Sequence, residues 1–181
     1  MKPDQAPGWL AGVLAVLIFQ SPAWSQSVHD YFAPRDAQTE QLLRSNEGHH
    51  LGPGIENLRA GGPQRLQYAK NEFDFILRIW PNHPRVLGLM AETLIRMRRP
   101  DLIEPYFQRA FQMSPDAGPL HLAYGVSLLR RDKVQDAIKH LARAAEADPG
   151  SADAHYNLGL ALVKDRQLDK ANESAQRAYA L

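Results

Sequence analysis

Histidine is the residue type in this sequence with the most direct route to chemistry, because its ring binds metals and transfers protons near neutral pH. His121 and His155 are 34 positions apart, and His29 accompanies the adjacent pair His49 and His50. A zinc site needs three or four ligands, and no cysteine or nearby carboxylate completes either set. The adjacent pair also precedes the sequence LGPG, which predicts a turn. We therefore predict no metal and no cofactor, with His121 and His155 in positions that a larger aromatic ring would otherwise fill.

Catalytic motifs are missing from the sequence. There is no glycine-rich phosphate loop, no serine in a nucleophile elbow and no zinc-protease histidine pair. The 181 residues include no cysteine, which excludes disulfides and thiol nucleophiles. Glu92 and Asp101 have no evident carboxylate partner in a shared cleft. The sequence thus favours a protein that is not an enzyme, and catalysis would need a site around His29, His49 or His50.

The charge of the chain is almost balanced, with 21 Lys and Arg against 20 Asp and Glu. A nucleic-acid-binding domain normally carries a basic excess, so we expect no nucleic-acid partner. The hydrophobic fraction of 44% is that of an ordinary globular protein and supports a packed core.

Residues 1–25 differ from the rest of the chain. A short polar head with Lys2 precedes ten apolar residues, Leu10 to Phe19, and the small-x-small sequence Ala23-Trp24-Ser25 follows. A membrane span needs about 20 apolar residues, so this run is too short to cross a bilayer. The order of head, apolar run and small residues is that of a secretory signal peptide. We predict cleavage after Ser25 and export, with a periplasmic location and at most peripheral contact with a membrane.

A period of 34 residues organises the second half of the sequence. Pro81, Pro115 and Pro149 are each 34 positions apart, and such spacing predicts a repeat architecture. Further columns repeat at the same period: Ala110, Ala144 and Ala178; Leu94, Leu128 and Leu162; and the small residues Ala91, Gly125 and Gly159.

Within each unit the apolar residues recur at three and four positions, which is helical spacing. The polar sequence KDRQ at 164–167 divides the last unit into two helices, and Gly159 and Ala171 should face each other across that hairpin. One helix pair cannot bury its apolar face alone, so the units must stack. The sequence predicts an all-α stack of antiparallel helix pairs.

The sequence AHYNLGLALVKDRQLDKANESAQRAYAL resembles a tetratricopeptide repeat in its period and its small residues. The resemblance implies a right-handed superhelical solenoid with repeats at 84–117, 118–151 and 152–181. Residues 63–83 resemble only the second helix of a degenerate repeat, after an irregular or helical segment at 26–62. With FILRIWPNHPRVL and the leader, the chain is similar to exported bacterial repeat proteins of undefined function. Ile103 departs from the usual alanine, and Pro105 is tolerable only in the first turn of its helix.

The resemblance also implies a concave groove lined by the first helix of each unit. It assigns Arg85, Gly88, Glu92, Ile95 and Arg96 to that face from the first clear unit. From the next two units we predict a partner-binding set, referred to below as the predicted groove set: Leu122, Val126, Leu129, Tyr156, Asn157, Leu160 and Val163.

We expect this face to bind an amphipathic helix or an extended peptide from a partner protein, in a cell-envelope scaffold. The alternatives are that the predicted N-terminal helix, residues 36–47, folds over it, or that the chain self-associates. Where repeat proteins that bind C-terminal carboxylates use Lys and Asn, this chain has Gly88, Glu92 and Ala123, and only Asn157 matches. The resemblance therefore disfavours a carboxylate clamp.

Basic residues recur in the turns within each helix pair, and stacking should align them along one edge. We call this set the basic ridge: Arg96, Arg98, Arg99, Arg130, Arg131, Lys133, Lys164 and Arg166. Such a ridge could attract an acidic partner or contact an anionic membrane surface. The alternative is that it is only a solvated rim.

Overall fold

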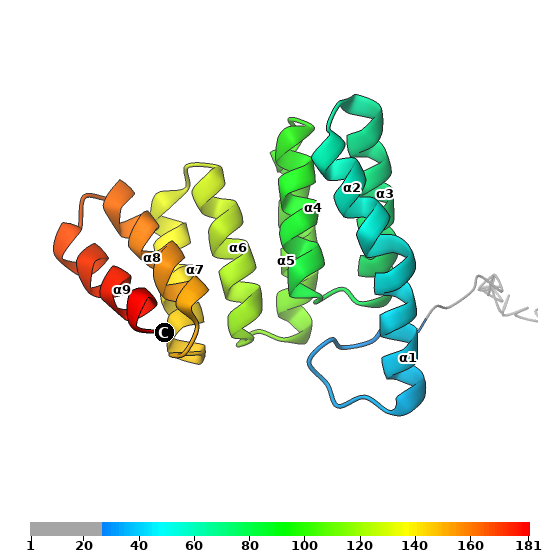
Figure 1. Cartoon of the computed structure of the whole chain (residues 1–181), viewed down its shortest axis with the longest axis horizontal. Helices are drawn as coiled ribbons and strands as arrows, with labels where there is room; N and C mark the ends of the chain where they lie inside the picture. The colour runs from blue at the N-terminus through cyan, green and yellow to red at the C-terminus, as the bar shows by residue number, and fades with distance from the viewer. Residues whose placement is uncertain (1–26) are drawn as a thin grey trace, which may run out of the picture.

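The computed structural model describes residues 27–181, which form helices joined by short turns (Figure 1). The elements are α1 (Ala37–Asn46), a π-helical turn η1 (Glu47–Leu51), α2 (Gly52–Ala60), α3 (Pro63–Ile79), α4 (Pro84–Arg96), a 3-10 turn η2 (Pro100–Leu102), α5 (Ile103–Met113), α6 (Gly118–Arg130), α7 (Val134–Ala147), α8 (Ala152–Lys164) and α9 (Leu168–Ala180). Four antiparallel pairs, α2 with α3 through α8 with α9, stand side by side along the described part of the chain. The predicted all-α solenoid is confirmed. The predicted cleavage site lies outside the described residues.

The hairpin turns of the last three pairs share one backbone conformation and one hydrogen bond to the preceding helix. Each contains a non-glycine residue in the left-handed region: Arg98 (φ 59°), Asp132 (φ 61°) and Arg166 (φ 63°), at intervals of 34 residues. The next N–H in each turn donates to a carbonyl in the last turn of the preceding helix, at 2.8 to 3.0 Å. This bond satisfies one of the carbonyls that a helix end leaves without a partner. The period in the sequence therefore fixes where each first helix ends.

The repeated columns form the core. Leu94, Leu128 and Leu162 are all buried, with exposed fractions of at most 4%. A Cβ at Gly159 would lie 3.5 Å from the Ala171 carbonyl oxygen, which confirms that these two positions face each other. Pro105 is the third residue of α5, so its missing N–H falls in the first turn, where it costs no hydrogen bond.

The first helix pair is more complete than we predicted. Helix continues from α1 through η1 into α2, and α2 packs against α3 as the first helix of the pair. The sequence LGPG is therefore not a turn, and that prediction was wrong. Pro53 lies at the start of α2, where its missing N–H is tolerated, and Gly54 lets the helices approach, because a Cβ there would lie 2.5 Å from Phe73 Cε1.

Candidate functional site

A groove with a volume of about 470 Å³ lies between α4 and α6 and is lined mainly by apolar side chains. Its floor comes from one face of each helix, and the start of α8 closes one end. The lining residues are Pro84, Arg85, Gly88, Leu89, Ala91, Glu92 and Ile95 of α4, Pro119, Leu122, Ala123, Val126, Ser127 and Arg130 of α6, and Asp153 of α8.

The predicted groove set is divided by the structure. Leu122 and Val126 are half-buried and line the groove. Leu129 packs against the core instead, and it is not part of the lining. On α8, the Asn157 side-chain amide donates to the Asp153 carbonyl of its own helix at 2.8 Å.

The apolar residues of α8 form a separate exposed strip beside the groove. Tyr156, Leu160 and Val163 are 58%, 42% and 53% exposed, and none of them lines the hollow. These α8 residues therefore belong to the surface outside the groove.

The half of the groove that comes from α4 was not in the predicted set, although the resemblance had assigned Arg85, Gly88, Glu92 and Ile95 to this face. Leu89, Ala91 and Ser127 were not anticipated. The sequence signal that could have predicted these α4 residues is the helical spacing of positions 85, 88, 92 and 95, which lie on one face of α4.

The alternative in which the N-terminal helix covers the groove is wrong. Helix α1 lies beside the α3–α4 end of the stack, away from α6 and α8 (Figure 1). Among the described residues, those that line the groove belong to α4, α6 and α8. The groove therefore faces solvent in this chain.

One ion pair crosses the rim of the groove. The Arg130 guanidinium contacts the Glu92 carboxylate at 2.6 Å, and Arg96 approaches the same carboxylate at 3.9 Å. Arg130, predicted for the basic ridge, therefore belongs to the groove as well. Arg85 is exposed at the other end of the floor.

The rest of the basic ridge is interleaved with carboxylates. Arg99 pairs with Asp101 at 3.0 Å, and Lys164 pairs with Asp132 at 2.9 Å. The hydrogen bond from Arg99 lowers the pKa of the Asp101 carboxyl. Such exposed pairs contribute little to stability, and they reduce the net positive charge that the ridge presents. The structure thus favours the solvated-rim interpretation.

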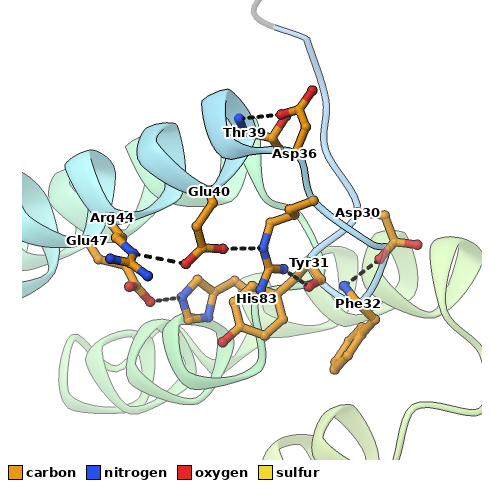
Figure 2. Close-up of polar contacts among 10 residues, drawn as sticks. Asp30, Tyr31, Phe32, Asp36, Thr39, Glu40, Arg44, Glu47 and His83 are labelled. Atoms are coloured by element: carbon orange, nitrogen blue, oxygen red, sulfur yellow. Dashed lines mark hydrogen bonds and ion pairs between the residues drawn. The ribbon is translucent and has the colours of Figure 1, made fainter.

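A second constellation lies at the corner between α3 and α4, where residues 27–36 cross it. We call these residues the strap (Figure 2). Tyr31 of the strap stacks on His83, with ring centroids 4.3 Å apart. The His83 Nε2 atom lies 2.9 Å from a Glu47 carboxylate oxygen, and burial is the main cause that lowers the pKa of His83. Arg35 donates to Glu40 at 2.8 Å and also to the Tyr31 carbonyl.

Comparison with known proteins identifies the family. The tetratricopeptide repeat family matches residues 89–152 and 122–181, which together cover half of the chain. This chain belongs to the tetratricopeptide repeat family.

Relatives of this tetratricopeptide repeat chain share the fold at modest identity. A TPR repeat-containing protein of Treponema pallidum (strain Nichols) is 36% identical over 75 residues, which are 41% of this chain and 9% of that protein. The chain thus spans under a tenth of that relative's length. The crystal structure of YrrB, described as a TPR protein with an unusual peptide-binding site, is 23% identical with a TM-score of 0.53 over 77% of this chain and 68% of that chain. MamA 41-end from Desulfovibrio magneticus RS-1 is 20% identical with the same TM-score over 78% and 93%.

The histidines of this tetratricopeptide repeat chain have structural contacts. The Nε2–H groups of His121 and His155 donate to the carbonyls of Pro115 and Pro149 at 2.9 and 3.1 Å, so each ring ties its helix to the preceding turn. His121 Nδ1 lies 2.9 Å from His140 Nδ1, and burial first, then the nearby His121, lowers the pKa of His140 to about 4. Within residues 27–181 there is no group of three or more His, Cys, Asp or Glu side chains placed to hold a metal ion.

Proposed function

We propose that this tetratricopeptide repeat protein is a non-catalytic interaction scaffold that binds an amphipathic helix or extended apolar peptide of a partner protein. The observation that carries the proposal is the groove between α4 and α6, with its apolar floor open to solvent. Contiguous exposed apolar surface usually marks an interaction site in a soluble protein.

The shape and chemistry of the groove support a peptide ligand. Small side chains at Gly88, Ala91 and Ala123 keep the floor low, while Leu122 and Val126 supply apolar contact. The pair of Glu92 and Arg130 and the exposed Arg85 offer polar contacts at the two ends. The same fold carries a peptide-binding site in YrrB, which supports this use of the groove.

The strip on α8 suits a ligand longer than the groove. Tyr156, Leu160 and Val163 follow helical spacing on the side of α8 that is exposed. A partner seated between α4 and α6 would reach them by extending along the concave face. We therefore propose that α8 contributes the outer part of the same surface.

We also propose that the protein acts after export, in the periplasm. The support is the sequence of residues 1–25, with its apolar run and small-x-small site. In the part of the chain that the structure describes, no helix combines the length and the hydropathy that a bilayer span requires.

The groove is tested by Val126→Asp, because a buried carboxylate on the floor would oppose an apolar ligand. Proteins crosslinked to the chain in its native cells would be isolated and identified for the wild type and the variant. We expect Val126→Asp to lose the main crosslinked partner while far-ultraviolet circular dichroism keeps its helical signal.

The matched control is Tyr68→Asp on α3, which introduces the same charge at a position that is 50% exposed and outside the groove lining. This control should retain the partner. Equal capture by Val126→Asp and the wild type would contradict the proposal.

Self-association is the second candidate function, and the exposed apolar side chains of α9 favour it. Leu168 is 65% exposed and Tyr179 is 95% exposed. Gel filtration over a range of protein concentrations separates the candidates, because self-association makes the apparent size rise with concentration. A constant monomer size would leave the partner scaffold as the better proposal.

A further inference from the structure

The corner between α3 and α4 is built differently from the corners of the later units. Trp80, Asn82 and His83 are consecutive but for Pro81, and their exposed fractions are 0%, 0% and 1%. At intervals of 34, the same positions hold smaller and more exposed residues: Ser114, Asp116 and Ala117, then Asp148, Gly150 and Ser151. Two bulky rings and a buried amide occur together at this corner and at neither of the two later corners. This difference indicates that the corner binds another segment of chain.

The strap covers this corner through its backbone. The His29 N–H donates to the Ile79 carbonyl at 2.8 Å, and the Tyr31 N–H donates to Asn82 Oδ1 at 2.8 Å. The Ile79 carbonyl is at the end of α3, where helix carbonyls lack a partner within the helix. Two backbone N–H groups two residues apart therefore bind the corner, and the chain turns directly after them, because the Ala33 N–H donates to the Asp30 carbonyl at 3.3 Å.

Side chains of the strap add selectivity. The His29 ring stacks on Trp80 with centroids 4.8 Å apart, and the Tyr31 ring stacks on His83 at 4.3 Å. Between them, the Asp30 carboxylate accepts from the Phe32 N–H at 2.9 Å (Figure 2). The same carboxylate also accepts from Asn82 Nδ2 at 2.5 Å. The corner thus recognises an acidic residue followed directly by a tyrosine.

The strap leaves part of the corner unsatisfied. Trp80 Nε1 and His83 Nδ1 are buried and have no hydrogen-bond partner among residues 27–181, although both rings contact the strap. A buried polar atom without a partner costs about 1–3 kcal/mol, so a peptide that reached these atoms would bind better than the strap does.

Attachment of the strap is also limited in extent. Val28 is 52% exposed and Phe32 is 39% exposed, and residues 27–36 lie outside any helix or strand. Segments with few buried apolar contacts open locally at low free energy. The strap can therefore leave the corner while the stack of helix pairs remains folded.

We propose that the α3–α4 corner is a second peptide-binding site, separate from the groove, for a segment in which an acidic residue precedes a tyrosine at the start of a turn. The strap is its ligand within the same chain, and a matching segment of another protein displaces it. This site does not depend on the function proposed for the groove.

Trp80 provides the readout. The full chain would carry Trp9→Phe and Trp24→Phe, so that Trp80 is the only one of the three tryptophans left. Adding Tyr31→Ala should release the strap, shift Trp80 emission to longer wavelength and increase its quenching by acrylamide. An excess of a synthetic peptide with the sequence of residues 27–33 should reverse both changes. The same peptide with Asp30 and Tyr31 in reversed order should not.

The controls keep the test decisive. Phe32→Ala removes the neighbouring, more exposed ring and should leave Trp80 shielded. Circular dichroism must show unchanged helicity, and Asp30→Asn replaces Tyr31→Ala if the latter lowers it. Trp80 emission that stays unchanged in both Tyr31→Ala and Asp30→Asn would overturn the proposal. So would exposed Trp80 that neither peptide protects, or that both peptides protect equally.

Discussion

Two glycines within helices, Gly125 of α6 and Gly88 of α4, meet different surroundings in the structure. A Cβ at Gly125 would lie 2.6 Å from Leu141 Cγ and 3.3 Å from the Leu141 backbone nitrogen, and Leu141 is fully buried. A Cβ at Gly88 would meet only the Ala123 Cβ, at 4.0 Å. The α6–α7 contact therefore requires glycine, whereas the groove floor only accommodates it.

Gly125→Ala should lower the free energy of unfolding by about 1–3 kcal/mol, because the added methyl group overpacks the α6–α7 contact. Gly88→Ala should raise the same free energy by about 1 kcal/mol or less, since alanine favours helix and finds space there. Urea unfolding followed by circular dichroism measures both. Equal effects of the two substitutions would contradict this account of the helix contacts.

Contacts within one period were predictable from the sequence, and contacts across the chain were not. Gly159 and Ala171 follow from small residues in two adjacent helices of one hairpin. By contrast, Tyr31 and Asn82 are 51 residues apart, and no periodic column connects them. Buried polar side chains such as Asn82 and His83 gave no signal, because only their distant partners in the strap explain them.

At the scale of the helix, Ser151, the N-cap residue of α8, differs from Ala117, the N-cap residue of α6. The Ser151 hydroxyl accepts from the Ala154 N–H at 3.2 Å and caps α8. Ala117 has nearly the same backbone (φ −70°, ψ 109° against φ −79°, ψ 98°) but no side chain that can cap α6. The backbone at both positions therefore suits a side-chain cap, but only α8 has one.

Ser151→Ala should lower the free energy of unfolding by about 1 kcal/mol, which is the usual cost of losing a cap. Ala117→Ser should raise it by about 0.5 kcal/mol, because the new hydroxyl can accept from the first turn of α6. Thermal unfolding of the two single variants and the wild type provides the measurement. A stabilising Ser151→Ala substitution would show that the hydroxyl does not act as a cap.

The period predicted the later helices correctly, but local composition misplaced the first pair. Glycine and proline at 52–54 favour a turn in isolation. In the structure they open α2, because packing against Phe73 makes a residue without a side chain useful there. The predicted groove set differed from the observed lining for a related reason. Which faces of two helices meet depends on how the units stack on one another, and the sequence of a single unit does not specify that stacking.

On the scale of the whole molecule, the last helix, α9, is less buried than α3 or α6. Six residues of α3 are buried, whereas only Ala171 and Ser174 are buried in α9. In repeat proteins each unit is stabilised mainly by its neighbours, so local opening follows local burial.

Backbone amides of α9 should therefore exchange hydrogen for deuterium faster than those of α3 and α6. Hydrogen exchange followed by mass spectrometry resolves the helices individually. One common exchange rate for all helices would show that the stack opens only as a single unit, contrary to this expectation.

The π-helical turn at 47–51 lets the helix absorb an additional residue without changing its direction. It holds one residue more than an α-helical turn would, and Gly48 in it is exposed. Deleting Gly48 should therefore close this turn to an ordinary α-helical one, with the helix on either side keeping its direction. Glu47 would stay on the side of His83, and the contacts between α2 and α3 would not change. The same deletion within a regular helix such as α3 would instead rotate everything before it by about 100°.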